Sequence, residues 1–117
     1  MTTSTTPEAL AQALTGCCNP EQQPLTDEQA EQIARVFKAL GDPNRVKLYS
    51  LIAAAAPEEM CACDLTQPVG LSQPTVSHHM KLLVDAGLVT REQRGRWAHY
   101  QPTPGPLNAA AQALTRT

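Results

Sequence analysis

The chain has 117 residues, a formal net charge of −2, and charged side chains at 17% of its positions. This length allows one domain with a single small core and excludes two independent domains. Small helical domains often gain stability by pairing, so a dimer is a reasonable expectation. No apolar run is long enough to cross a bilayer, and the N-terminus lacks the cationic and apolar regions of a signal peptide, so we expect a cytoplasmic protein.

The charges are distributed unevenly along the chain. Residues 1–64 contain four basic and nine acidic side chains, whereas residues 65–117 contain five basic and two acidic ones. The net charge therefore changes from −5 to +3 between the two parts. Because the second part is cationic, the overall negative charge does not exclude binding to nucleic acid.

The N-terminal segment has the composition of a mobile arm. Residues 1–24 are rich in Thr, Pro and Gln and contain the adjacent pair Cys17 and Cys18. Such polar segments cannot bury enough apolar surface to form a core. We therefore expect an arm over residues 1–24, followed by one folded domain over residues 25–117.

Two helices are predicted at the start of this domain. Thr26 and Gln29 form a capping box, and apolar residues then recur at helical spacing until a glycine interrupts the pattern. Asp42 and Pro43 supply an N-cap and a proline at the first helical position, which start a second helix that we expect to run to about Ala56.

The next segment has the pattern of a helix-turn-helix. A short third helix is predicted over residues 63–69, Gly70 supplies the turn, and a fourth helix should run from Ser72 to Ala86. Apolar residues lie on one face of this fourth helix and polar residues on the other. In a helix-turn-helix the second helix enters the major groove of DNA.

A β-hairpin and a last helix complete the predicted fold. Residues 88–101 are strand-like on both sides of the turn signal at Arg94 and Gly95, and a hairpin after a helix-turn-helix is a wing. Residues 106–114 are rich in alanine and favour a last helix that packs against another subunit. The expected fold is mainly α with a β-hairpin wing, that is, a dimeric winged helix-turn-helix.

Candidate DNA contacts lie on the fourth helix and on the hairpin. Gln73 can pair with adenine through two hydrogen bonds, and shorter side chains can contact neighbouring bases, while cationic side chains contact phosphates. A solvated polar face on an ordinary helix pair is the alternative. We interpret Trp97 and Tyr100 as core or sheet residues, and His79 and His99 as structural histidines. The full set of DNA-contact candidates is Gln73, Thr75, Ser77, His78, Lys81, Arg94 and Arg96.

Two further cysteines, Cys61 and Cys63, lie just before the helix-turn-helix. In a reducing compartment four cysteines indicate free thiols, metal ligands or redox sensors more than structural disulfides. On an ideal helix these two side chains would point about 200° apart, so both can bind one ion only if the helix begins at or after Cys63 or unwinds there. The histidines have no nucleophile partner in sequence and no glycine-rich phosphate loop is present, so we do not expect an enzyme.

Four segments together resemble the ArsR/SmtB family of metal-sensing winged-helix repressors, in its arsenic-sensing branch. They are residues 39–45 (ALGDPNR), 61–65 (CACDL), 71–80 (LSQPTVSHHM) and 95–100 (GRWAHY), and the resemblance covers roughly residues 26–101. It implies a homodimer, formed through the first and last helices, that binds an inverted-repeat operator and leaves it when an inducer ion binds. It also implies that Gln73, Ser77 and His78 touch bases.

The resemblance also indicates where the inducer site lies. One family site uses Asp, His and Glu on the last helix, but residues 104–117 contain none of these. The other uses a Cys-X-Cys pair, here Cys61 and Cys63. Similar arsenic sensors add a third cysteine three positions further on, where this chain has Thr66.

A third thiol must therefore come from the arm, and we expect the ligands among Cys17, Cys18, Cys61 and Cys63. Trivalent arsenic and antimony bind three thiolates, cadmium and lead accept three or four soft ligands, and zinc could use all four thiols. The leading hypothesis is a repressor released by arsenite. A cadmium- or lead-responsive repressor, and a thiol redox switch with an arm-to-helix disulfide, remain open alternatives.

Overall fold

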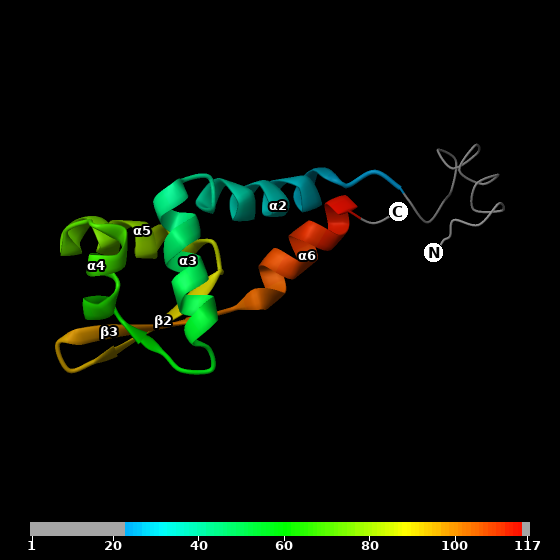
Figure 1. The fold of residues 1–117 in the computed structure, drawn as a ribbon. Helices are drawn as coiled ribbons and strands as arrows, with labels where there is room; N and C mark the ends of the chain where they lie inside the picture. The colour runs from blue at the N-terminus through cyan, green and yellow to red at the C-terminus, as the bar shows by residue number, and fades with distance from the viewer. Residues whose placement is uncertain (1–22, 116–117) are drawn as a thin grey trace.

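The computed structural model describes residues 23–115. The expected arm therefore lies almost entirely outside the described residues, as do Cys17 and Cys18. Figure 1 shows the described part as a set of helices with a small sheet. In that part, no helix has both the length and the apolar character needed to cross a membrane.

The first two helices have the predicted starts. Helix α2 spans Asp27–Ala39, and the capping box at its N-terminus is formed as expected from Thr26 and Gln29. Helix α3 spans Pro43–Ala55, with the side chain of its N-cap Asp42 accepting a hydrogen bond from a backbone N–H. Both predictions are confirmed because capping signals are local and need no tertiary contact.

The helix-turn-helix is present, although its first helix is shorter than predicted. Residues 63–69 do not form one helix: the 3₁₀ helix η3 covers Ala62–Asp64, and helix α4 covers only Thr66–Val69. The turn uses Gly70 in the left-handed region, with φ of 69°. Helix α5 spans Gln73–Asp85 and begins after the predicted N-cap Ser72.

The wing belongs to a three-stranded antiparallel sheet in the order β1-β3-β2. Strands β2 (Val89–Arg94) and β3 (Trp97–Pro102) form the predicted hairpin. Strand β1 (Met60–Cys61) was not predicted, because it has only two residues and pairs with β3 far along the chain. One of the two cysteines that precede the helix-turn-helix therefore belongs to the wing sheet.

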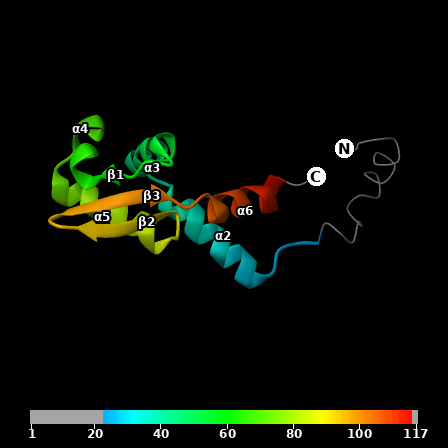
Figure 2. The same ribbon diagram turned by 90° about the horizontal axis from the view of Figure 1, so that it is seen from below.

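The core lies between the helices and one face of the sheet. Leu48 and Ile52 of α3 are fully buried there, as are Met80 and Leu83 of α5, and Tyr100 of β3 is nearly so. The last helix α6 spans Pro104–Thr115, beginning slightly before the predicted start. Helices α2 and α6 lie side by side at one end of the molecule, away from the hairpin (Figures 1 and 2).

Candidate DNA-binding surface and thiol site

Helix α5 presents a polar face to solvent because its apolar positions are used by the core. Val76, Met80 and Leu83 are buried at helical spacing. The predicted DNA-contact residues of this helix are all exposed: Gln73, Thr75, Ser77, His78 and Lys81. The short helix α4 is held beside α3, since the Lys47 ammonium donates a hydrogen bond of 2.8 Å to the carbonyl oxygen of Pro68. In a helix-turn-helix the second helix reads the DNA and the first supports it. Here α5 has the place of the reading helix, and α4 has that of the supporting helix.

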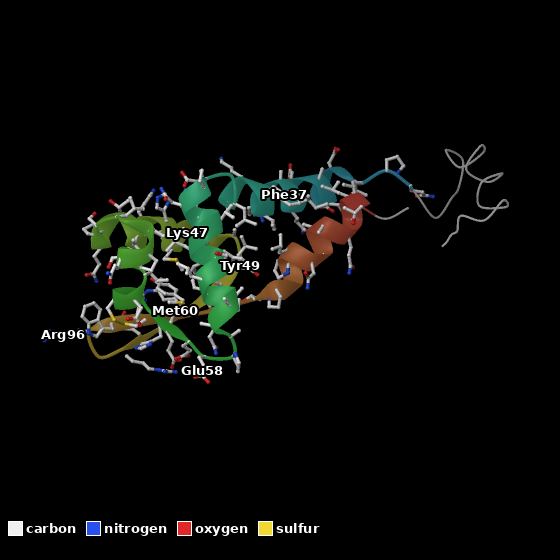
Figure 3. All side chains as sticks on the ribbon, viewed as in Figure 1. Phe37, Lys47, Tyr49, Glu58, Met60 and Arg96 are labelled. Carbon is white, nitrogen blue, oxygen red and sulfur yellow. A yellow bond between two sulfur atoms is a disulfide. The ribbon has the colours of Figure 1, made fainter. Side chains whose placement is uncertain are left out.

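A hollow of about 330 Å³ separates α5 from the hairpin. Gln73, Ser77 and Lys81 line it from α5, and Arg96 lines it from the hairpin. Figure 3 shows Arg96 at the hairpin tip. The structure thus brings four of the seven DNA-contact candidates to one hollow, and Thr75, His78 and Arg94 do not line it.

Two further polar residues line this hollow, Arg91 and Gln93 of strand β2, and their side chains are hydrogen bonded to each other. The sequence indicates Arg91, with Arg94 and Arg96, as one of three arginines around the hairpin turn that are suited to reaching phosphates, whereas Gln93 was missed. Gln93 also donates to the carbonyl oxygen of Gly95, at 3.0 Å, which holds the pair along the strand. Alternation along a strand puts Arg91 and Gln93 on one face and Arg94 on the other, and this period of two could have identified Gln93.

Two of the predicted phosphate contacts already have acidic partners. The Lys81 ammonium lies 2.9 Å from a carboxylate oxygen of Asp85, and both side chains are exposed. The Arg94 guanidinium forms ion pairs with Glu59 and Glu92. The hydrogen bond from Arg94 to Glu92 raises the pKa of Arg94, and Glu59 acts in the same direction. A phosphate would have to compete with these carboxylates, so both contacts stay predictions.

Cys61 and Cys63 come together without any distortion of a helix. Cys61 is extended, with φ of −73° and ψ of 144°, and only then does η3 begin. Their Cα atoms are 5.2 Å apart, and the structure joins the two sulfur atoms as a disulfide. The N–H of Cys63 also donates to Sγ of Cys61, at 3.3 Å. The 200° divergence of an ideal helix is thus avoided, and the unwinding step considered from the sequence is unnecessary.

The thiol pair lies between the wing and the reading helix. Cys61 pairs with His99 of β3 in the sheet, and Glu59, two residues earlier, is bonded to Arg94 of β2. Ala62, between the cysteines, is buried and also lines the hollow beside α5. Cys63 is exposed. A displacement of Cys61 and Cys63 would therefore act on both elements that carry the candidate DNA contacts.

The described residues alone do not form a candidate ion site. Within residues 23–115, no three His, Cys, Asp or Glu side chains are gathered in a way that could hold a metal ion. Two converging sulfurs are nevertheless the donor type that thiophilic ions prefer. The predicted third and fourth ligands, Cys17 and Cys18, fall outside the described residues.

Comparison with known proteins identifies the class. Residues 42–91 match the family model described as bacterial regulatory protein, arsR family. A proposed arsenical resistance operon repressor from Halobacterium salinarum is 37% identical over 103 residues, which cover 88% of this chain and 85% of that protein. The arsenical resistance operon repressor of Staphylococcus aureus is 41% identical over 84 residues, covering 72% of this chain and 78% of its own.

A solved structure agrees with the fold. The homodimeric winged helix-turn-helix DNA-binding domain from Mycobacterium bovis is similar with a TM-score of 0.60 and 25% identity, covering 76% of this chain and 83% of that one. The fold and the exposed reading helix define a winged helix-turn-helix transcriptional regulator. The chain belongs to the arsR family of bacterial regulatory proteins, and it is a DNA-binding transcriptional repressor of that family and not an enzyme.

Proposed function

We propose that this protein is a metalloid-responsive repressor. A homodimer binds double-stranded operator DNA and is released when trivalent arsenic, or antimony, binds cysteine thiolates. The observation that carries this proposal is the convergence of Cys61 and Cys63 between the wing and the reading helix. The similarity to two arsenical resistance operon repressors supports arsenic as the inducer.

The ligand set is completed from the arm. In the reduced protein, Cys61 and Cys63 supply two thiolates, and Cys17 or Cys18 supplies the third that a three-coordinate arsenic or antimony ion requires. Residues 1–24 serve as the ligand-carrying arm, and residues 25–117 as the DNA-binding and dimerisation domain. The protein acts in the cytoplasm, where its operator is located.

Release follows if the ion favours the free conformation over the DNA-bound one. An ion held by the two reduced thiolates and by a thiolate of the arm pulls on Cys61 and Cys63 and moves the backbone that carries them. Because Cys61 belongs to β1 and Cys63 to η3, this movement shifts the wing sheet relative to the segment that packs on α5. A preference of about 1 to 3 kcal/mol for the free conformation is typical of such coupling.

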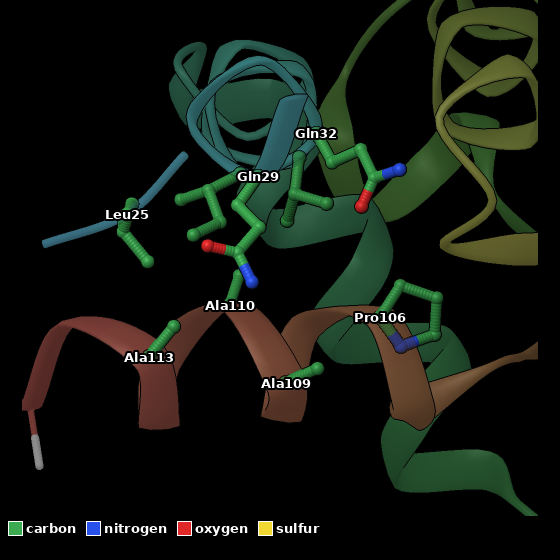
Figure 4. A pocket seen from close by; sticks show the side chains of 9 residues that line it. Leu25, Gln29, Gln32, Pro106, Ala109, Ala110 and Ala113 are labelled. Carbon is green, nitrogen blue, oxygen red and sulfur yellow. The ribbon is translucent and has the colours of Figure 1, made fainter. Parts of the chain in front are cut away.

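Dimerisation uses the end of the molecule opposite the hairpin. A hollow of about 280 Å³ lies between α2 and α6, and Ile33 and Val36 line it beside proline and alanine side chains of α6. Figure 4 shows Ala109, Ala110 and Ala113 directed from α6 toward this hollow. Leu114 of α6 is 56% exposed. A second copy covering this apolar surface agrees with the homodimeric relative.

The test is a release titration. A fluorescein-labelled duplex, selected on the wild-type protein from a random DNA pool, reports binding by anisotropy. Arsenite, antimonite, cadmium, lead and zinc are then added to the reduced wild type and to each single Cys→Ser variant. We expect release by stoichiometric arsenite or antimonite, and loss of that release in the Cys61 and Cys63 variants. Release by cadmium or lead alone would establish the alternative inducer class.

A redox-sensing repressor is the second candidate, and one observation favours it. The structure joins Cys61 and Cys63 as a disulfide. This differs from the arm-to-helix disulfide that the sequence favoured. Oxidation by diamide, without any ion, separates the candidates. Diamide that releases the labelled duplex, with full recovery after reduction, would support the redox switch, whereas a duplex that stays bound under diamide and leaves with arsenite would exclude it.

A further inference from the structure

A polar connection links the end of α2 to the reading helix through one side chain of α3. The Arg45 Nε donates a hydrogen bond of 2.6 Å to the carbonyl oxygen of Ala39. Its Nη1 lies 3.0 Å from Nδ1 of His79 in α5. Three helices therefore meet at one guanidinium, which is half-buried between them.

The chemistry of arginine suits this position. Ala39 is the last residue of α2, and carbonyl groups in the last turn of a helix have no partner within the helix. A cation there is also favoured by the helix dipole. Guanidinium presents its donors in a rigid fork, so one side chain can bind two acceptors in fixed directions, which a lysine ammonium on a flexible stem does less well.

The hydrogen bond from Arg45 defines the tautomer of His79. Arginine has no acceptor, so Nδ1 of His79 must accept, and the imidazole is neutral with its proton on Nε2. A protonated imidazole would carry a hydrogen on Nδ1, lose this bond and place a second cation against the guanidinium. The other ring in contact with His79 is that of His78 on the same helix, at 6.2 Å between centroids, and Lys38 lies in the last turn of α2.

His79 lies in the middle of the reading helix α5. It follows His78, a predicted base contact, and precedes Met80, which is anchored in the core. We propose that Arg45 is a positioning residue: through neutral His79 it holds α5 at a defined rotation relative to α2. Because α2 lies at the proposed dimer end, the same contact sets the placement of each reading helix within the dimer.

This inference rests on DNA binding by the proposed repressor but not on the identity of its inducer. Operator affinity should depend on an acceptor at the position of Nδ1 of His79, which receives the hydrogen bond from Arg45. A purely structural contact would alter stability without making affinity depend on an acceptor at this one position.

The experiment compares His79→Asn, His79→Leu and Arg45→Lys with the wild type, using the labelled duplex and no inducer. Anisotropy titrations at pH 8 give the affinities, and thermal unfolding monitors the fold. The Asn oxygen replaces Nδ1 as an acceptor. His99→Asn is the matched control, because His99 lies in the sheet and not in the connection.

We expect His79→Asn to bind within about threefold of the wild type, because it keeps an acceptor for Arg45. His79→Leu and Arg45→Lys should bind about tenfold more weakly, and His99→Asn should bind like the wild type. Equal losses of affinity in His79→Asn and His79→Leu, or full affinity in His79→Leu, would overturn the inference. Arsenite added at pH 8 to the His79→Asn complex tests the inducer separately, so the two proposals can fail independently.

Discussion

Cys61 and Cys63 differ from their serine analogues by one atom each, and that atom is the donor type that thiophilic ions prefer. Sulfur also accepts only a weak hydrogen bond from the Cys63 N–H, which a serine oxygen can replace. Neither side chain belongs to the fully buried core. Replacement by serine should therefore remove ion binding while leaving the local fold intact.

We expect Cys61→Ser and Cys63→Ser each to abolish release of the labelled duplex by arsenite, with DNA affinity within a few-fold of the wild type. Anisotropy with and without arsenite measures both effects. The control is Ser50→Ala, a substitution on the exposed side of α3 that should respond to arsenite normally. A large loss of DNA affinity in the cysteine variants would instead make these residues structural.

The three arginines of the hairpin carry the same charge but have different neighbours. Arg91 and Arg96 line the hollow beside α5, whereas Arg94 is held by two carboxylates. Each arginine that neutralises a phosphate contributes about one unit to the slope of log affinity against log salt. We therefore expect Arg91→Ala and Arg96→Ala each to reduce the slope by about one unit. Arg94→Ala should reduce it less, and an equal reduction would show that DNA displaces Glu59 and Glu92.

At the scale of single elements, the turn between α4 and α5 depends on backbone conformation alone. Gly70 has φ of 69°, yet a Cβ built there would meet nothing within 4 Å. Its replacement by alanine is therefore strained without any clash. The left-handed conformation costs an ordinary residue about 1 to 2 kcal/mol.

We expect Gly70→Ala to lower the free energy of unfolding by about 1 to 2 kcal/mol, measured by urea denaturation. Gly70→Asn is the matched control, because asparagine enters the left-handed region more readily than alanine does. Asparagine there should lower stability less than alanine does. Equal effects of the two substitutions would contradict the conformational explanation.

The elements that were predicted correctly are those with local signals. The capping box of α2, the Asp42 and Pro43 start of α3 and the glycine turns depend on residues a few positions apart. Strand β1 escaped prediction because its two residues are extended only by pairing with β3, about forty positions later. The same reason explains the thiol site, since Cys61 was interpreted by helical geometry while the sheet makes it extended.

Contacts between distant segments could not be predicted from the sequence for a related reason. The Arg45 to His79 hydrogen bond spans 34 positions, and the Arg94 to Glu59 ion pair spans 35. The choice of partner in each contact depends on how the helices and the sheet pack. The DNA-reading helix itself was predictable because its apolar stripe is a property of α5 alone.

At the scale of the whole molecule, the proposed DNA-binding surface and the proposed dimer interface lie at opposite ends. The reading helix and the hairpin lie at one end of the molecule, and helices α2 and α6 lie at the other (Figure 1). The apolar hollow is lined by residues of α2 and α6. An inverted-repeat operator presents two equal half-sites, so a dimer that joins two copies at the second end can bind both at once. Disrupting that end should weaken DNA binding without touching any DNA contact.

We expect Ala109→Glu to convert the dimer into a folded monomer, because a carboxylate would be buried in the apolar hollow when the second copy binds. Light scattering after size-exclusion chromatography measures the mass, and circular dichroism the fold. Gln112→Glu is the control, since it adds the same charge to an exposed position of α6 outside the hollow. The Ala109 variant should bind a two-half-site duplex far more weakly than the control does, while both bind a single half-site equally. An Ala109→Glu dimer with unchanged mass would place the interface elsewhere.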